Sequence, residues 1–83
     1  MIEYDPTRPK WQQIADVLRE QIRSGDLAAN QLVSEVQLEQ AFGVARTTVR
    51  KATAALRAEG LIVTTPGMGS FVAPSRAEAP END

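Results

Sequence analysis

The chain has no cysteine and no histidine, and these two absences narrow its chemistry. Without thiols it cannot form disulfides, cysteine-ligated zinc sites or a thiolate nucleophile. Without imidazole it has no histidine metal ligand and no histidine general base. Catalysis would depend on carboxylates or on a serine, and no base with an orienting partner is evident beside them. We therefore expect a protein that is not an enzyme, binds no metal and needs no cofactor.

Long apolar runs are also absent, since no stretch approaches the roughly 20 residues that span a bilayer. The first five residues, Met1 to Asp5, lack the basic and then apolar layout of a signal peptide. These absences predict a cytoplasmic, bacterial-type protein without a membrane partner. What remains is a chain of 83 residues, 42% hydrophobic and 24% charged, which suits one small globular domain.

Acidic and basic residues nearly balance over the whole chain, but they are distributed unevenly along it. Its net charge is −2, which argues against a non-selective binder of polyanions. Residues 45–73 nevertheless carry four basic side chains and one acidic one, whereas residues 74–83 carry one basic and three acidic ones. A local basic surface is what attracts a phosphate backbone. We expect residues 1–73 to form the domain and residues 74–83 to be a disordered acidic tail.

Apolar spacing predicts three helices, each followed by a glycine, at residues 10–24, 35–42 and 46–59. Before the second helix, the Ser34 hydroxyl suits a capping box. In this motif the hydroxyl accepts from the Gln37 amide, and the Gln37 side chain bonds the backbone amide of Ser34. In this region the side chains expected to pack inward are Leu27, Leu32, Leu38, Ala41 and Phe42.

Two segments rich in β-branched residues follow the helices, at 61–65 and 70–73. The Pro-Gly-Met-Gly sequence of residues 66–69 lies between them and supplies a loop, so the pair is predicted to be a β-hairpin. The expected fold is mainly α with a small β-hairpin: a winged helix-turn-helix of three helices plus a two-stranded wing.

The outward start of the third helix carries the first group of candidate DNA contacts. A recognition helix places its N-terminal residues against base edges in the major groove. Arg46 and Arg50 can pair bidentately with guanine, while Thr47 and Thr48 can hydrogen bond to a base or a phosphate. Lys51 suits a phosphate contact. Each of these residues also has a purely structural interpretation: the arginines and the lysine as solvated charges, and the threonines as residues that are favoured near a helix start.

The loop of the hairpin carries the second group of candidate contacts. Gly67 and Gly69 let the backbone approach a narrow groove without side-chain obstruction, and Met68 is expected at the tip between them. A single winged-helix domain of this size buries little DNA surface and should bind weakly alone. We therefore expect a homodimer on DNA, with one chain on each half-site.

Five segments, in this order, resemble the N-terminal domain of GntR-family transcription regulators: Trp11-Gln12-Gln13-Ile14-Ala15, Leu32-Val33-Ser34-Glu35, Phe42-Gly43-Val44-Ala45-Arg46-Thr47-Thr48-Val49-Arg50, Glu59-Gly60-Leu61-Ile62 and Gly67-Met68-Gly69-Ser70-Phe71-Val72. The resemblance covers roughly residues 8–73. It implies a winged-helix DNA reader, usually a repressor that acts as a dimer on a palindromic operator in double-stranded DNA. The positions that it implies for contact are Arg46, Thr47, Thr48 and Arg50 in the third helix, Gly67 in the wing at the minor groove, and Ser34 and Glu35 where the second helix meets phosphate.

The chain departs from the family's usual pattern at several positions. Val33 stands in place of proline, and Ala29-Asn30 stands in place of a frequent Pro-Gly pair. Val36 replaces a basic residue, so no contact is assigned there. Glu39 occupies a position that is usually small. Ala45 replaces serine, threonine or asparagine, which removes a helix-capping oxygen worth about 1 kcal/mol.

Two functions of different class remain after these observations. The first is a sequence-specific DNA-binding regulator, most often a repressor, that lacks the family's usual C-terminal effector-binding domain, so that no small-molecule effector is implied. The alternative is a winged-helix protein-interaction module without DNA binding, which the neutral charge of residues 1–73, the acidic tail and Ala45 favour. Salt-dependent binding to duplex DNA distinguishes the two.

Overall fold

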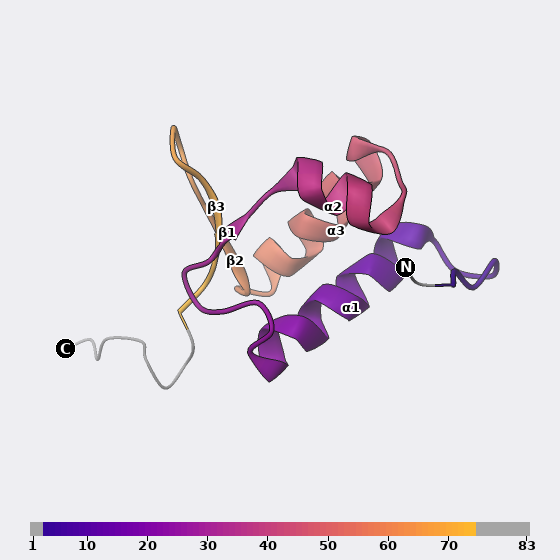
Figure 1. Cartoon of the computed structure of the whole chain (residues 1–83), viewed down its shortest axis with the longest axis horizontal. Helices are drawn as coiled ribbons and strands as arrows, with labels where there is room; N and C mark the ends of the chain where they lie inside the picture. Colours follow the sequence, from indigo (N-terminus) through magenta and orange to yellow (C-terminus); the bar gives the residue numbers. More distant parts are fainter. Residues whose placement is uncertain (1–2, 75–83) are drawn as a thin grey trace.

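The computed structural model describes residues 3–74. Its elements, in chain order, are α1 Lys10–Ser24, β1 Leu32–Val33, α2 Glu35–Phe42, α3 Arg46–Ala58, β2 Ile62–Thr65 and β3 Gly69–Val72 (Figure 1). Three helices and a hairpin are thus confirmed, with α3 one residue shorter than predicted. Figure 1 shows α1 along one side of the molecule, while α2 and the tip of the β2–β3 hairpin rise on the other side. The predicted tail lies outside the described residues from 75 onward.

The sheet has three strands in the order β1-β3-β2, so the prediction of a two-stranded wing was incomplete. The central strand β3 pairs antiparallel with both neighbours, and Leu32 of β1 lies opposite Phe71. Before β1, the Asn30 amide donates to the Val72 carbonyl at 2.8 Å. Asn30 has φ 70°, a left-handed conformation that asparagine tolerates better than most residues. Asn30 therefore makes the turn before β1 in a conformation that is usually left to glycine.

The pairing of β1 decides which side chains of the sheet are buried. Leu32 is 56% exposed, so the prediction that it packs inward was wrong. It lies in register with Phe71 and Val63 on the outer face, whereas Ile62 and Val72 of the inner face are buried. The prediction for Ala41 in α2 was also wrong, since this side chain is exposed. Both errors concern small segments whose orientation is set by distant partners.

The core lies between α1, one face of α3 and the inner face of the sheet. Its buried apolar members are Ile14, Ala15, Leu18, Phe42, Val49, Ala52, Leu56, Ile62 and Val72. Within α3 the buried positions recur at helical spacing, which leaves the opposite face of the helix in solvent. Full burial of one such aliphatic side chain contributes about 1.5–3 kcal/mol. The core thus holds α3 by one side and presents the other.

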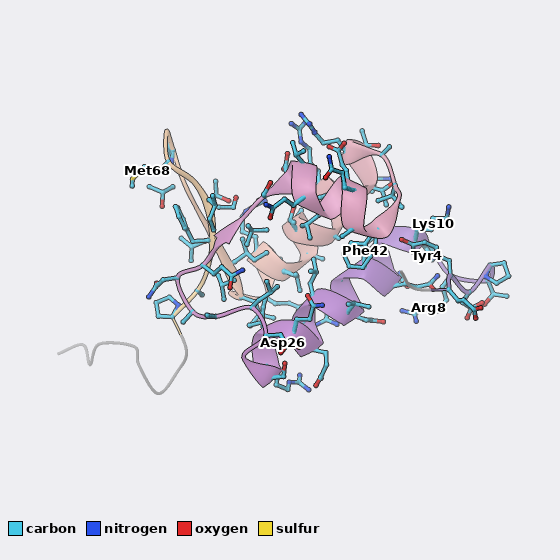
Figure 2. All side chains as sticks on the ribbon, in the orientation of Figure 1. Tyr4, Arg8, Lys10, Asp26, Phe42 and Met68 are labelled. Carbon is cyan, nitrogen blue, oxygen red and sulfur yellow. The ribbon has the colours of Figure 1, made fainter. Side chains whose placement is uncertain are left out.

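Polar contacts fasten the segment before α1 to this core. The Tyr4 hydroxyl donates to the Phe42 carbonyl at 2.6 Å, and the Lys10 ammonium lies 5.1 Å from the centroid of the Tyr4 ring (Figure 2). The buried Gln13 side chain accepts from the Asp5 amide at 2.7 Å and donates to the Asp5 carbonyl at 2.9 Å. Residues 4–9 are therefore held against α1 and the end of α2.

Candidate nucleic-acid interface

The helix-turn-helix is formed by α2, a short turn and α3. The Ser34 hydroxyl accepts from the Gln37 amide at 3.2 Å, as the capping box predicts, while the described residues show no return bond from the Gln37 side chain. Gly43 ends α2 in the left-handed conformation and donates to the Glu39 carbonyl at 2.8 Å. Ala45 then begins α3 in an extended conformation without a side-chain cap. The first amides of α3 thus have no capping side chain, and such free amides favour an anion.

The first turn of α3 presents its polar side chains to solvent. Arg46, Thr47, Arg50 and Lys51 are exposed and Thr48 is half-buried. The intervening Val49 is fully buried and anchors this turn to the core. The helical spacing of these residues therefore places the polar side chains in solvent and Val49 in the core, as expected from the sequence.

Two carboxylates of α2 lie against the arginines of α3. The Nε of Arg50 donates to Glu35 Oε1 at 3.3 Å, and the Nε of Arg46 donates to Glu39 Oε2. The hydrogen bond and the charge of Glu39 raise the pKa of the Arg46 guanidinium above its ordinary value. Glu39 thus fits beside α3 as the partner of an ion pair, with its side chain 26% exposed. No feature of the sequence identified this pair, because it depends on the crossing of α2 and α3.

Arg57 is a further basic residue on the exposed side of α3, and the sequence did not lead us to include it among the candidate DNA contacts. Its Nε donates to the Thr64 hydroxyl at 2.9 Å, and that hydroxyl lies 2.9 Å from the Ser70 hydroxyl. The link joins the end of α3 to both strands of the wing. The available signal was helical spacing, since Arg57 follows Arg46 and Arg50 on one side of the helix.

The wing ends in a tight turn that exposes its tip. The Met68 amide donates to the Thr65 carbonyl at 3.0 Å, with Gly67 at φ 79°, a type II turn. Met68 is 69% exposed and projects from the tip (Figure 2). Gly69 has φ 115°, and a Cβ atom there would lie 3.3 Å from Leu32 Cδ1. The positive φ therefore favours glycine at the start of β3, and a Cβ atom there would be in tight contact with the Leu32 side chain.

The candidate residues form two separate groups. Ser34, Glu35, Arg46 and Arg50 come together where α2 meets α3. The wing residues 67–69 do not join them, because the hairpin tip lies apart from α2 and α3, although it rises on the same side of the molecule (Figure 1). Two separated contact groups on one side suit a long ligand better than a small molecule.

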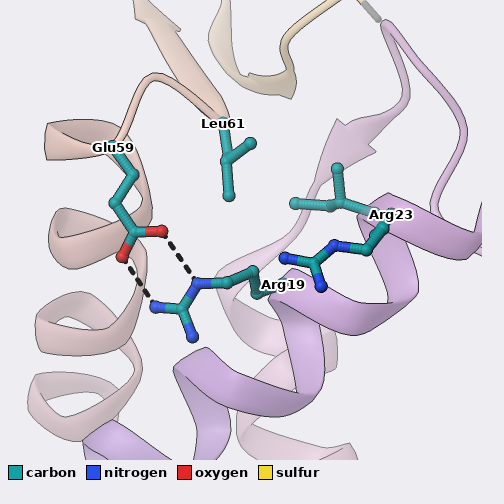
Figure 3. A pocket seen from close by; sticks show the side chains of 5 residues that line it. Arg19, Arg23, Glu59 and Leu61 are labelled. Atoms are coloured by element: carbon teal, nitrogen blue, oxygen red, sulfur yellow. Dashed lines mark hydrogen bonds and ion pairs between the residues drawn. The ribbon is translucent and has the colours of Figure 1, made fainter.

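A charged cluster elsewhere connects α1 with the end of α3. Arg19 donates to both carboxylate oxygens of Glu59, at 2.8 and 2.6 Å (Figure 3), and to Asp16 at 2.8 Å. The bonds from Arg19 lower the pKa of Glu59, and hydrogen bonds from Arg8 and then Arg19 lower the pKa of Asp16. A hollow of about 340 Å³ beside the cluster is lined in part by Arg23 and Leu61. It contains none of the candidate DNA contacts.

Residues 3–74 bring together no group of three acidic side chains able to hold a metal ion. Nor does any helix within this range have the length and apolar character needed to cross a membrane.

Comparison with known proteins identifies the family. The family described as "Bacterial regulatory proteins, gntR family" matches residues 10–72. An uncharacterised HTH-type transcriptional regulator, RB1450 of Rhizobium meliloti, is 46% identical over 63 residues, which cover 75% of this chain and 26% of that protein. The HTH-type transcriptional repressor NagR of Bacillus subtilis is 38% identical over 71 residues, 84% of this chain and 29% of NagR.

Solved structures agree with these relatives. The crystal structure of AraR(DBD) in complex with operator ORX1 superposes with a TM-score of 0.77 at 34% identity, covering 87% of this chain and 93% of the AraR chain. This match supports the winged helix-turn-helix architecture across most of the described residues. The chain spans less than a third of the two curated relatives. From its helix-turn-helix, its wing and these matches, the chain belongs to the gntR family of bacterial regulatory proteins.

Proposed function

We propose that this chain is a sequence-specific DNA-binding regulator that acts as a repressor on a palindromic operator in double-stranded DNA. The observation that carries the proposal is the arginine pair Arg46 and Arg50, exposed at the start of α3 and flanked by carboxylates of α2. The structural relative AraR(DBD), which is in complex with an operator, supports it. We assign this role to residues 1–73 as one DNA-binding domain, and we propose no catalytic activity.

The two contact groups have different tasks in this proposal. The start of α3 enters the major groove, where Arg46 and Arg50 read guanine and Thr47 and Thr48 contact bases or phosphates. Lys51 contacts phosphate. The wing reaches the minor groove beside the same site, with residues 67–69 at its tip, and the start of α2 at Ser34 and Glu35 lies toward the phosphate backbone.

Two chains bind one operator in this proposal. One winged helix covers only a short stretch of duplex, and a second copy doubles the contacts without enlarging the protein. A palindromic site gives each copy the same half-site, which matches the symmetry of a two-fold dimer.

Selection of bound sequences from random duplexes, followed by titration of the selected site, tests the function. Arg46→Ala and Arg50→Ala should each weaken binding to that site by about 1–3 kcal/mol and relax its sequence preference. Arg23→Ala is the matched control, because Arg23 is 71% exposed on α1 and lies outside both contact groups. Retained affinity and preference in both α3 variants would refute the site. Saturation at one chain per palindrome would refute the dimer.

A winged-helix interaction module without DNA binding is the alternative, and the comparisons do not favour it. Affinity for duplex DNA that falls steeply with salt is expected for the regulator, because bound lysine and arginine release counterions. An interaction module should show no such binding at low ionic strength.

A further inference from the structure

The two arginines at the start of α3 are held in the same way. Each is bonded through Nε to a carboxylate of α2, Arg46 to Glu39 and Arg50 to Glu35. Among residues 3–74, no hydrogen bond reaches the terminal Nη1 and Nη2 atoms of either arginine. The two terminal nitrogens of each guanidinium, which can form paired hydrogen bonds with guanine, are therefore left available, while Nε is held by a carboxylate.

The Glu39 bond is the firmer of the two. The Glu39 side chain is 26% exposed, whereas Glu35 is 37% exposed and lies 3.3 Å from its arginine. A carboxylate with less solvent around it loses less of its attraction to screening.

We infer that Glu39 is a specificity-determining positioning residue: it holds the Arg46 guanidinium so that its terminal nitrogens meet a base edge, and it offsets part of the charge with which Arg46 attracts any phosphate. The inference rests on the proposed DNA-binding function. It has two consequences of opposite sign. Removal of Glu39 should strengthen binding to unrelated duplexes and weaken discrimination between the correct base pair and others.

Three variants separate position from charge. Glu39→Ala removes both the hydrogen bond and the charge, and Glu39→Gln removes the charge but keeps an acceptor of the same shape. Glu20→Ala is the control, because it removes the same charge from α1, where Glu20 is 70% exposed and lies 4.0 Å from Arg23. The free proteins are first compared by NMR, in which the Arg46 Nε–Hε resonance should shift in Glu39→Ala and stay in place in Glu20→Ala.

Discrimination is then measured with the selected operator and with a duplex changed at the base pair whose preference Arg46→Ala abolishes. We expect Glu39→Ala to lower the affinity ratio of the two duplexes about tenfold, which is within the range that one bidentate contact supplies. Glu39→Gln should retain most of the ratio, and both Glu39 variants should bind an unrelated duplex more tightly than the wild type.

The outcomes distinguish the inference from the function on which it rests. An unchanged ratio in Glu39→Ala, or an equal fall in Glu39→Ala and Glu39→Gln, overturns the positioning role while wild-type discrimination upholds the function. A wild-type chain that does not distinguish the two duplexes overturns both. An Arg46 Nε–Hε resonance that is identical in wild type and Glu39→Ala also overturns the inference, because the ion pair is then absent in solution.

Discussion

A single hydroxyl, that of Tyr4, connects the chain before α1 with the helix-turn-helix. Tyr4 donates to the carbonyl of Phe42, the last residue of α2, at 2.6 Å. The final carbonyls of a helix have no partner within it, so this bond satisfies one of them. The contact therefore fixes the end of α2 close to the turn that orients α3.

Tyr4→Phe should lower the free energy of unfolding by about 1 kcal/mol, because it removes one part-buried hydrogen bond and keeps the ring. Urea denaturation followed by circular dichroism measures the change. Tyr4→Leu, which also removes the ring that Lys10 approaches, should cost more than Tyr4→Phe. Equal stability of wild type and Tyr4→Phe would show that the bond contributes nothing.

At the residue scale, the sequence predicted orientation better than partnership. Helical spacing alone places Arg46 and Arg50 on the solvent side of α3, as the structure has them. The ion pair of Arg46 with Glu39 could not be found in this way, because it depends on the angle between two helices. The hydrogen bond of Tyr4 to Phe42 joins residues 38 positions apart and was equally inaccessible.

At the element scale, the N-cap residue of α3 has the backbone conformation of a cap but no side-chain acceptor. Ala45 has φ −72° and ψ 159°, which is the extended conformation of an N-cap residue, and its side chain offers no acceptor. A serine at this position can accept from an amide of the first turn without any backbone change.

Ala45→Ser should therefore raise the free energy of unfolding by about 1 kcal/mol. Ala54→Ser is the matched control, since Ala54 is exposed in the middle of the same helix and serine there is slightly unfavourable. Thermal and urea unfolding of both variants measure the difference. The same stability change in both variants would argue that capping is not the cause.

Elements specified by their own residues were predicted well, and those specified by distant residues were not. The bounds of α1 and α2 follow from apolar spacing, Ser34 and the glycines after each helix. The two-residue strand β1 has no pattern of its own and forms because the free edge of β3 accepts it. The same pairing turned Leu32 outward, against the prediction.

At the scale of the whole molecule, stability should depend on pH only outside the neutral range. The sequence has no histidine or cysteine, so no side chain has an ordinary pKa between those of glutamate and tyrosine. On the alkaline side, burial raises the pKa of Tyr4, so its contribution is complete below about pH 10 and declines as pH rises through the folded-state value.

On the acid side, Arg19 connects α1 with the end of α3 through Glu59, and it also binds Asp16 within α1. Hydrogen bonds from Arg19 lower the pKa of Glu59, and those from Arg8 and Arg19 lower that of Asp16. A carboxylate with a lowered folded-state pKa contributes stability that is present above its unfolded pKa and is lost as pH falls through the folded one. The free energy of unfolding should thus be level from about pH 6 to 9 and fall below about pH 4.

Arg19→Gln should flatten this acid decline, because Glu59 then titrates near its unfolded value and loses its pH-dependent contribution. Urea midpoints at pH 7, 5 and 3 (chosen about the ordinary carboxyl pKa values) measure the effect. Arg23→Gln is the control, since Arg23 lies 4.0 Å from Glu20 with both side chains largely exposed. Wild type and Arg23→Gln should lose stability in parallel, whereas Arg19→Gln should begin less stable at pH 7 and approach them at pH 3. Parallel curves for all three proteins would show that the ion pairs of Arg19 do not control acid stability.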